Sequence, residues 1–89
     1  MKIAKFTTSF KKDIKRQKKR GKSKEKLQTI VEMICRDGDP PEKYRPHDLV
    51  GNWVNYRECH IEPDWLLIYV VEAEYVVFNR TGTHADLFD

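Results

Sequence analysis

Apolar residues in the second half of the chain form three strand-like runs. The runs are Trp53 to Ile61, rich in aromatic and branched residues, Trp65 to Val71, which is apolar throughout, and Tyr75 to Phe78. The linkers between them, Glu62-Pro63-Asp64 and about Glu72-Ala73-Glu74, are short enough to force antiparallel hairpins. The pattern therefore predicts a three-stranded meander.

The first half has the spacing of helices. Residues 2–7 predict a short strand, and Ser9 suits the N-cap of a helix that ends at about Arg20. A second helix is expected to begin after Ser23 and to end before Gly38. Four apolar residues give it a core-facing stripe: Leu27, Ile30, Val31 and Ile34.

The order of these elements predicts the fold class. Residues 39–51 read as a loop, so the order is β-α-α-β-β-β. It predicts an α+β fold with a small antiparallel sheet and two helices packed on one face. A chain of 89 residues makes a single domain, residues 1–89, with one modest core.

Charge is distributed very unevenly. The formal net charge is +3, yet residues 1–26 hold twelve Lys and Arg against two acids, and the remainder holds five against twelve. So dense a basic surface attracts phosphate backbones without reading their sequence. The alternative is a solvated helix face that keeps a small protein in solution.

The cysteine count and the lengths of the apolar runs indicate the expected cellular compartment. Cys35 and Cys59 are too few for a disulfide scaffold or a zinc ribbon, so we expect buried, reduced thiols. No apolar run approaches the roughly 20 residues that a membrane span needs, and no apolar signal segment is present. We therefore expect a cytoplasmic protein with no membrane partner.

Chemically versatile side chains gather at the predicted strand ends, where functional sites are commonly built. In a meander, the end of the first strand, the start of the second and the end of the third share one edge, which predicts that His60, Asp64 and Arg80 are neighbours. Thr83-His84-Ala85-Asp86 fits a helix-capping pattern, so His84 should open a short helical turn just past that edge.

This set of residues suits RNA cleavage. RNA carries its own nucleophile, the 2′-hydroxyl, so cleavage needs a base, an acid and positive charge around the phosphate. We assign Arg80 as the phosphate clamp and His84 as a proton-transfer residue, expected to be the general acid. His60, Asp64 and His47 are candidates for base, orienting group and electrostatic support.

Simpler explanations remain open for several of these residues. Asp64 suits a turn after Pro63, and His47 suits a loop. Paired spacings such as C-x-x-C are absent, and the adjacent Cys59 and His60 point to opposite sheet faces, so no metal or other cofactor is expected. Phe88 has little chain left to bury it and could stack on a nucleotide.

The run HDLVGNWVNYRECHIEPDWLLIYV, followed by RTGTHADLF, resembles the YafQ branch of the RelE/ParE superfamily of bacterial toxins. The resemblance is close over residues 44–88 and agrees only in character over the basic first half. It implies a RelE-like fold and a type II toxin that cleaves messenger RNA in the ribosomal A site. The positions that match the functional pattern of this branch are His47, His60, Asp64, Trp65, Arg80, His84 and Phe88.

The resemblance also implies partners. They are the 70S ribosome, messenger RNA and a cognate antitoxin, in a toxin–antitoxin complex that we expect to be a heterotetramer or larger. Trp65 and Phe88 are expected to contact RNA, and the basic residues expected to do so are Lys11, Lys12, Lys15, Lys18, Lys19 and Arg20. A non-catalytic gyrase inhibitor of the ParE kind and a plain RNA-binding module are the alternatives, but neither needs acid–base groups around an arginine.

Overall fold

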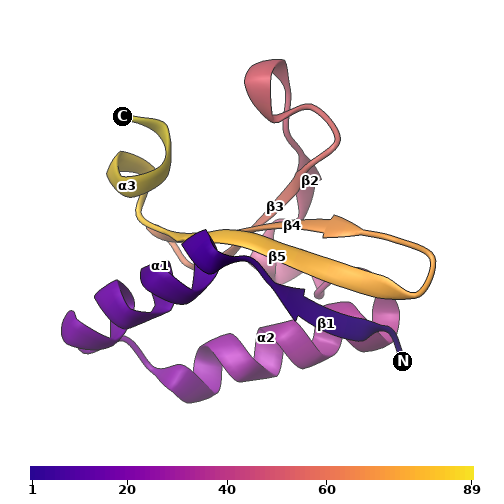
Figure 1. Ribbon diagram of the computed structural model, residues 1–89, viewed down its shortest axis with the longest axis horizontal. Helices are drawn as coiled ribbons and strands as arrows, with labels where there is room; N and C mark the ends of the chain where they lie inside the picture. Colours follow the sequence, from indigo (N-terminus) through magenta and orange to yellow (C-terminus); the bar gives the residue numbers. More distant parts are fainter.

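The three predicted strands form an antiparallel meander inside a five-stranded sheet (Figure 1). The computed structural model describes all 89 residues. The strand order across the sheet is β1-β5-β4-β3-β2. The strands are β1 (Ile3–Phe6), β2 (His47–Asp48), β3 (Arg57–Glu62), β4 (Trp65–Val71) and β5 (Tyr75–Gly82). The α+β class is confirmed, with helices α1 (Thr8–Lys19) and α2 (Lys24–Asp37) covering one face of the sheet.

The sheet differs from its prediction at both edges. β1 pairs with β5 in parallel, so the sheet is mixed. Two helices and the other three strands separate β1 from β5 along the chain, so no hairpin fixes their relative direction. β2 lies in the segment predicted to be a loop and pairs with Arg57 and Glu58. Two residues are too few for apolar alternation to reveal a strand.

Two strand boundaries also move. Trp53 lies in a short 3₁₀ turn, Gly51–Trp53, and β3 begins only at Arg57. β5 continues past Phe78 to Gly82, so Arg80 lies inside a strand and not at its end. The apolar run stops at Phe78, but the backbone pairing with β4 continues through polar residues that hydrophobicity cannot indicate.

The helices are α1 (Thr8–Lys19), α2 (Lys24–Asp37) and α3 (His84–Phe88), and none of them is long and apolar enough to cross a membrane. Ser23 caps α2 and Thr83 and Asp86 form the capping box of α3, as predicted. α1 is capped by Thr7, which corrects the assignment of Ser9. The Thr7 hydroxyl also donates to the carbonyl of Asn79 (3.0 Å), a tertiary contact that sequence spacing does not show.

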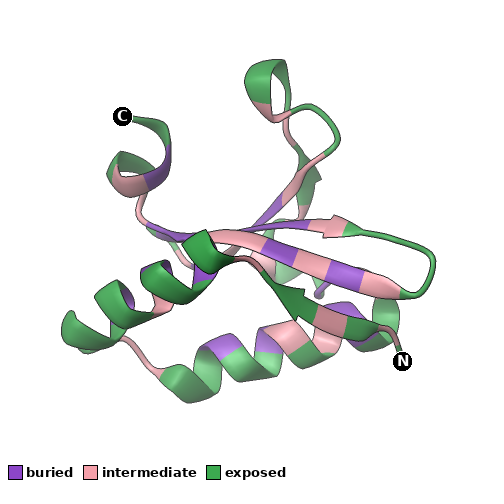
Figure 2. Cartoon of the chain, viewed as in Figure 1, coloured by how far each residue is buried: buried purple, intermediate pink, exposed green.

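The core lies between the sheet and the two long helices. Buried residues follow β4, β5 and the inner sides of α1 and α2 (Figure 2). A smaller cluster on the opposite face contains Leu66, Ile68 and Leu87, and it anchors α3. Cys35 and Cys59 are buried and unpaired, and burial raises the pKa of Cys59 to about 12. These thiols are therefore structural and unreactive at neutral pH.

One buried carboxylate ties α1 to β5. Asp13 is 2% exposed and accepts hydrogen bonds from Arg80 Nε (2.7 Å), Arg80 Nη2 (3.2 Å) and the Thr81 backbone N–H (3.1 Å). The bonds from Arg80 also raise the pKa of its guanidinium. Because the carboxylate is surrounded by donors, its burial is compensated, and losing it would leave the half-buried Arg80 guanidinium and the Thr81 N–H without their acceptor.

We expect Asp13→Asn to lower the free energy of unfolding by about 3 kcal/mol, the usual size for breaking a buried pair on one side. Urea unfolding followed by circular dichroism measures it. Lys12→Ala, on the exposed side of the same helix, should stay within about 0.5 kcal/mol of wild type. Equal stabilities for the two variants would show that the Asp13 contacts are dispensable.

Candidate active site

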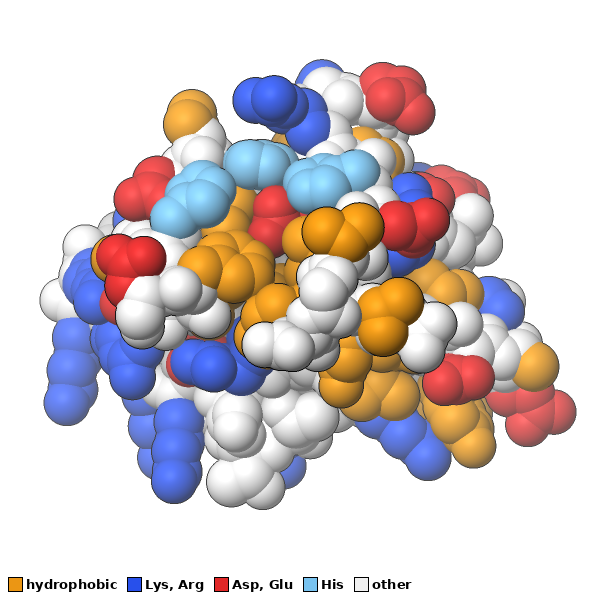
Figure 3. All heavy atoms as spheres, turned by 90° about the horizontal axis from the view of Figure 1, so that it is seen from above, with side chains coloured by type: hydrophobic (Ala, Val, Ile, Leu, Met, Phe, Trp, Pro, Cys, Tyr) orange, Lys and Arg blue, Asp and Glu red, His pale blue; other side chains and the backbone are white.

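Three histidines lie in a row on the sheet face opposite α1 and α2. They come from three elements: His47 from β2, His60 from β3 and His84 from the first turn of α3. The ring centroids of His47 and His60 are 6.0 Å apart, as are those of His60 and His84. Figure 3 shows the three rings side by side on this face. The structure thus brings together histidines separated by up to 37 positions along the chain.

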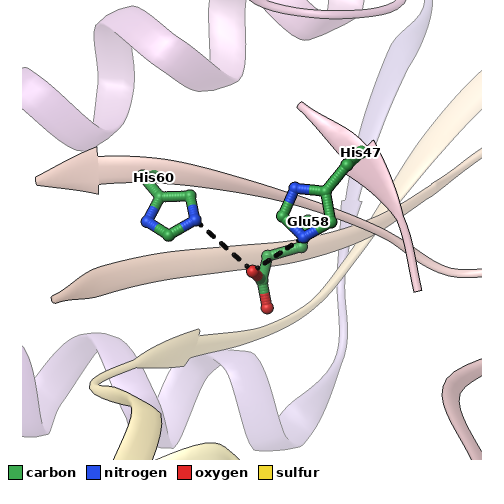
Figure 4. Close-up of side chains that lie close together, drawn as sticks. All are labelled: His47, Glu58 and His60. Atoms are coloured by element: carbon green, nitrogen blue, oxygen red, sulfur yellow. Dashed lines mark ion pairs between the residues drawn. The ribbon is translucent and has the colours of Figure 1, made fainter. Parts of the chain in front are cut away.

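A buried glutamate joins two of these histidines. The β2–β3 register places His47 directly opposite Glu58, and Glu58 and His60 share a face because they are two residues apart in one strand. Glu58 Oε1 lies 3.2 Å from His47 Nε2 and 3.6 Å from His60 Nε2 (Figure 4). Sequence reasoning missed Glu58 as a site residue, although strand alternation with His60 was a usable signal.

Both histidines of this cluster contact a backbone carbonyl as well as Glu58. His47 Nδ1 lies 2.8 Å from the Arg45 carbonyl, and because a carbonyl only accepts, this nitrogen carries a proton. Its Nε2 then faces the Glu58 carboxylate. His60 repeats the pattern, with Nδ1 3.3 Å from the Pro63 carbonyl. Two imidazoles and one carboxylate therefore lie close enough together to exchange a proton.

The third histidine is oriented by an aspartate. Asp64 Oδ1 accepts from the His84 backbone N–H (2.9 Å) and lies 2.6 Å from His84 Nδ1. Both bonds lower the pKa of Asp64, and the bond from the His84 backbone has the larger effect. With Nδ1 held by a carboxylate, the His84 side chain is 55% exposed and has Nε2 available for proton transfer.

The row ends in an aromatic ring. Phe88 is 42% exposed, its ring centroid lies 6.4 Å from that of His84, and Trp53 supports it edge-on at 6.0 Å. This position suits stacking on a base. Trp65 was predicted to contact RNA as well, but it is 1% exposed and its indole donates to the Thr81 hydroxyl (2.9 Å). The prediction for Trp65 is wrong, because the side chain belongs to the core.

The contacts of Arg80 differ from those expected of a free phosphate clamp. Its Nε and Nη2 donate to Asp13, so one edge of the guanidinium fork is already occupied and only Nη1 has no partner within the protein. The strand interior holds Arg80 against α1, whereas the prediction placed it at a free strand end. The electrostatic support of the site must therefore come largely from other groups.

The basic residues of α1 divide into two kinds. Five lysines are exposed and pair with no carboxylate: Lys11, Lys12, Lys15, Lys18 and Lys19. Arg20 instead forms a two-point pair with Asp86 (2.5 and 3.0 Å), which lowers the pKa of Asp86 strongly and raises that of Arg20. Arg20 thus fastens α1 to α3, and its charge is partly neutralised.

The histidine row also contains a set of metal-ligand atoms. His47, Glu58 and His60 each offer one, all within 4.8 Å of one another. Two imidazoles and a carboxylate are ligands that zinc and copper accept. Because the residues come from two paired strands, the set has no ligand-spacing motif in the sequence, so the argument from spacing does not exclude a metal here.

Comparison with known proteins places the chain among small bacterial toxins. The family model of YafQ, a bacterial toxin of type II toxin–antitoxin systems, matches residues 2–89. The mRNA interferase toxin YafQ of Escherichia coli (strain K12) is 40% identical over 84 residues, covering 93% of this chain and 91% of the relative.

Solved structures agree with the sequence comparison. YafQ in the E. coli DinJ–YafQ toxin–antitoxin complex matches with a TM-score of 0.89 and 38% identity, covering 99% of this chain and 98% of the other. A metal-bound toxin from Helicobacter pylori matches with a TM-score of 0.89 and 32% identity, covering 99% and 100%.

The Asp64–His84 contact predicts a specific titration. Asp64 should ionise below its ordinary range, and His84→Ala should restore only part of the ordinary pKa, since the backbone N–H at position 84 still donates. Carbon-detected NMR of the carboxyl group against pH measures both values. Phe88→Ala, which leaves both bonds in place, is the control. A pKa unaffected by His84→Ala would contradict the pairing.

Proposed function

This chain belongs to the YafQ family of type II toxins and is an mRNA interferase, and we propose that it cuts messenger RNA on the ribosome with the histidine row as its catalytic centre. The observation that carries the proposal is the set of three imidazoles, 6.0 Å from ring to ring, with His84 oriented by Asp64. The reaction needs a proton acceptor and a proton donor on either side of one phosphate.

The roles follow from how each ring is held. The 2′-oxygen attacks the phosphorus, His60 takes the 2′-hydroxyl proton into the cluster shared with Glu58, and the 5′-oxygen leaves with a proton from His84. The products are a 2′,3′-cyclic phosphate and a 5′-hydroxyl. Asp64 orients His84, because its carboxylate holds Nδ1 at 2.6 Å.

The remaining candidates support this exchange. His47, 3.2 Å from Glu58, is assigned to electrostatic support as the phosphate becomes more negative in the transition state. Phe88 stacks on a base beside His84. Arg80 keeps a part in the proposal as a positioning residue, since its pairing with Asp13 fixes the end of β5, from which α3 and His84 follow.

The basic face of α1 is the proposed ribosome contact. Its five unpaired lysines project from one exposed helix and can neutralise ribosomal RNA phosphates. In this proposal, the chain cleaves messenger RNA in the ribosomal A site. The α1 lysines hold ribosomal RNA while the histidine row faces the codon. A free-RNA nuclease would have less need of this second cationic surface.

A cognate antitoxin is the second partner. The E. coli relative was solved in complex with the antitoxin DinJ, and we infer an equivalent partner for this chain, in an assembly that is a heterotetramer or larger. The partner has to prevent access to the histidine row or to the ribosome. The basic α1 face and the exposed row both offer surfaces for an acidic or aromatic antitoxin segment.

Removing the proposed acid tests the proposal. His84→Ala should lower cleavage on programmed ribosomes by about 10² to 10⁴-fold, the usual size for lost acid–base catalysis, with folding and ribosome binding kept. His84→Gln retains hydrogen-bonding capacity near Asp64 but cannot transfer the proton, so it should be equally slow. Primer extension on the messenger RNA measures new 5′ ends.

The controls separate the function classes. An RNA with a 2′-deoxy nucleotide at the cleavage position should remain intact, because the nucleophile is missing. Wild-type activity in a folded His84→Ala protein would remove the catalytic role. DNA breaks without new RNA ends in cells that express the chain would favour the gyrase inhibitor of the ParE kind.

Charge reversal on α1 tests the ribosome contact. Changing Lys11, Lys15 and Lys18 to Glu should weaken ribosome binding and reduce the slope of log affinity against log salt by about one for each lost phosphate contact. Sedimentation with 70S ribosomes over a salt series measures it. Arg36→Glu, at the far end of α2, should leave the slope unchanged. The same slope in the triple variant would place the contact elsewhere.

A further inference from the structure

Five of the six arginines are paired with carboxylates. Arg16 and Arg20 face Asp86, Arg36 pairs with Asp37, and Arg57 and Arg80 donate to Asp39 and Asp13. Arg45 is the exception, since it is exposed and has no acidic partner within 4.0 Å. An arginine presents a fork of donors that matches a phosphate, and this one is available.

The backbone at Arg45 points to a role as well. Arg45 has φ 55° and ψ 51°, the left-handed conformation that residues with a side chain adopt at a cost. Its N–H closes the preceding 3₁₀ turn on Glu42, and its carbonyl accepts from His47 Nδ1 at 2.8 Å. The strained residue is therefore fixed directly beside the histidine row.

A cavity of about 560 Å³ connects Arg45 with the row. It lies between α2, the 3₁₀ turn Glu42–Tyr44 and the end of β3, and both Arg45 and His60 line it. This volume is within the range of small-molecule sites and accommodates a nucleotide. Figure 3 shows Lys and Arg side chains immediately beside the histidines on this face.

The other cations of the cavity are less available than Arg45. Lys26 is bound to Glu62 (2.9 Å), which Lys22 also contacts (2.7 Å). Lys43 lies 5.1 Å from the centre of the Tyr44 ring and has no acidic partner. The cavity thus combines one unpaired guanidinium, one unpaired ammonium and a half-buried tyrosine ring with the carboxylates of Glu25 and Glu62. The first three are groups that bind phosphate and contact a base.

We propose that this cavity is a nucleotide subsite, in which Arg45 binds an RNA phosphate next to the scissile one and Tyr44 contacts the attached base. Phe88 stands at the opposite end of the row, beside His84. The RNA strand then crosses the three histidines with one nucleotide at Phe88 and another in the cavity. The inference rests on the proposed function, and it supplies the phosphate contact that the engaged Arg80 does not provide.

The proposed subsite binds a phosphate that does not react. Removing the Arg45 contact should therefore raise KM more than it lowers kcat. Arg45→Asn removes the guanidinium but suits the left-handed backbone, so the carbonyl bond to His47 should persist. The probe is a trinucleotide RNA with a 2′-deoxy central residue, which binds without being cut. NMR titration of the backbone amides follows binding at positions 43 to 45 and at His60.

We expect the trinucleotide to shift those amides in the wild-type protein, and Arg45→Asn to weaken its binding by about 10-fold, the loss of one charged hydrogen-bonded contact. The dependence on salt should fall by about one charge. Arg45→Lys should bind with intermediate affinity, because lysine keeps the charge without the fork. Arg36→Asn, another exposed arginine, should bind like wild type.

On programmed ribosomes, Arg45→Asn should raise KM by a similar factor with little change in kcat. Wild-type affinity and KM in this variant, with cleavage by the wild-type protein intact, would overturn the subsite and leave the proposed function standing. Absence of amide shifts around the cavity at millimolar trinucleotide would also overturn it. A wild-type protein that leaves RNA uncut would remove the proposed function, while the binding titration would still decide the role of Arg45.

Discussion

The buried Asp13 carboxylate is the contact on which the geometry of this protein depends. It accepts from Arg80 and from the Thr81 backbone, so α1 is locked onto the end of β5. Three residues after Thr81, the chain enters α3 at His84. Asp86 belongs to the capping box of α3 and also binds Arg20 at the end of α1. Helix α1 therefore holds both ends of the segment that presents His84, and the position of the proposed acid follows from packing on the far side of the sheet.

The centre of the fold could be predicted because its causes are local. Linkers of a few residues allow only hairpins, and hydroxyl residues such as Ser23 and Thr83 cap helices through bonds within one turn. The edges could not be predicted. The parallel pairing of β1 and the two-residue strand at His47 depend on which segments meet in three dimensions, and they leave no periodic signal in the sequence.

In the site, too, local contacts could be predicted from the sequence and long-range contacts could not. Asp64 and His84 could be paired in advance, since one begins a strand of the meander and the other opens the turn beyond it. Glu58 was overlooked because a charged residue beside Arg57 suggests a surface ion pair, whereas the β2–β3 register turns it inward between two imidazoles. The pairing of Arg80 with Asp13 was not anticipated, because Asp13 lies 67 positions away along the chain.

Pairing with acids decides which cations this protein can offer to RNA. A basic sequence suggests that any arginine near the histidines could hold a phosphate, but carboxylates engage all of them except Arg45. The unpaired lysines of α1 form one cationic surface, and Arg45 with Lys43 forms a second beside the histidines. The acids thus do more than offset charge. By fixing arginines inside the scaffold, they leave unpaired cations at the two surfaces that we propose contact ribosomal RNA and the cleaved strand.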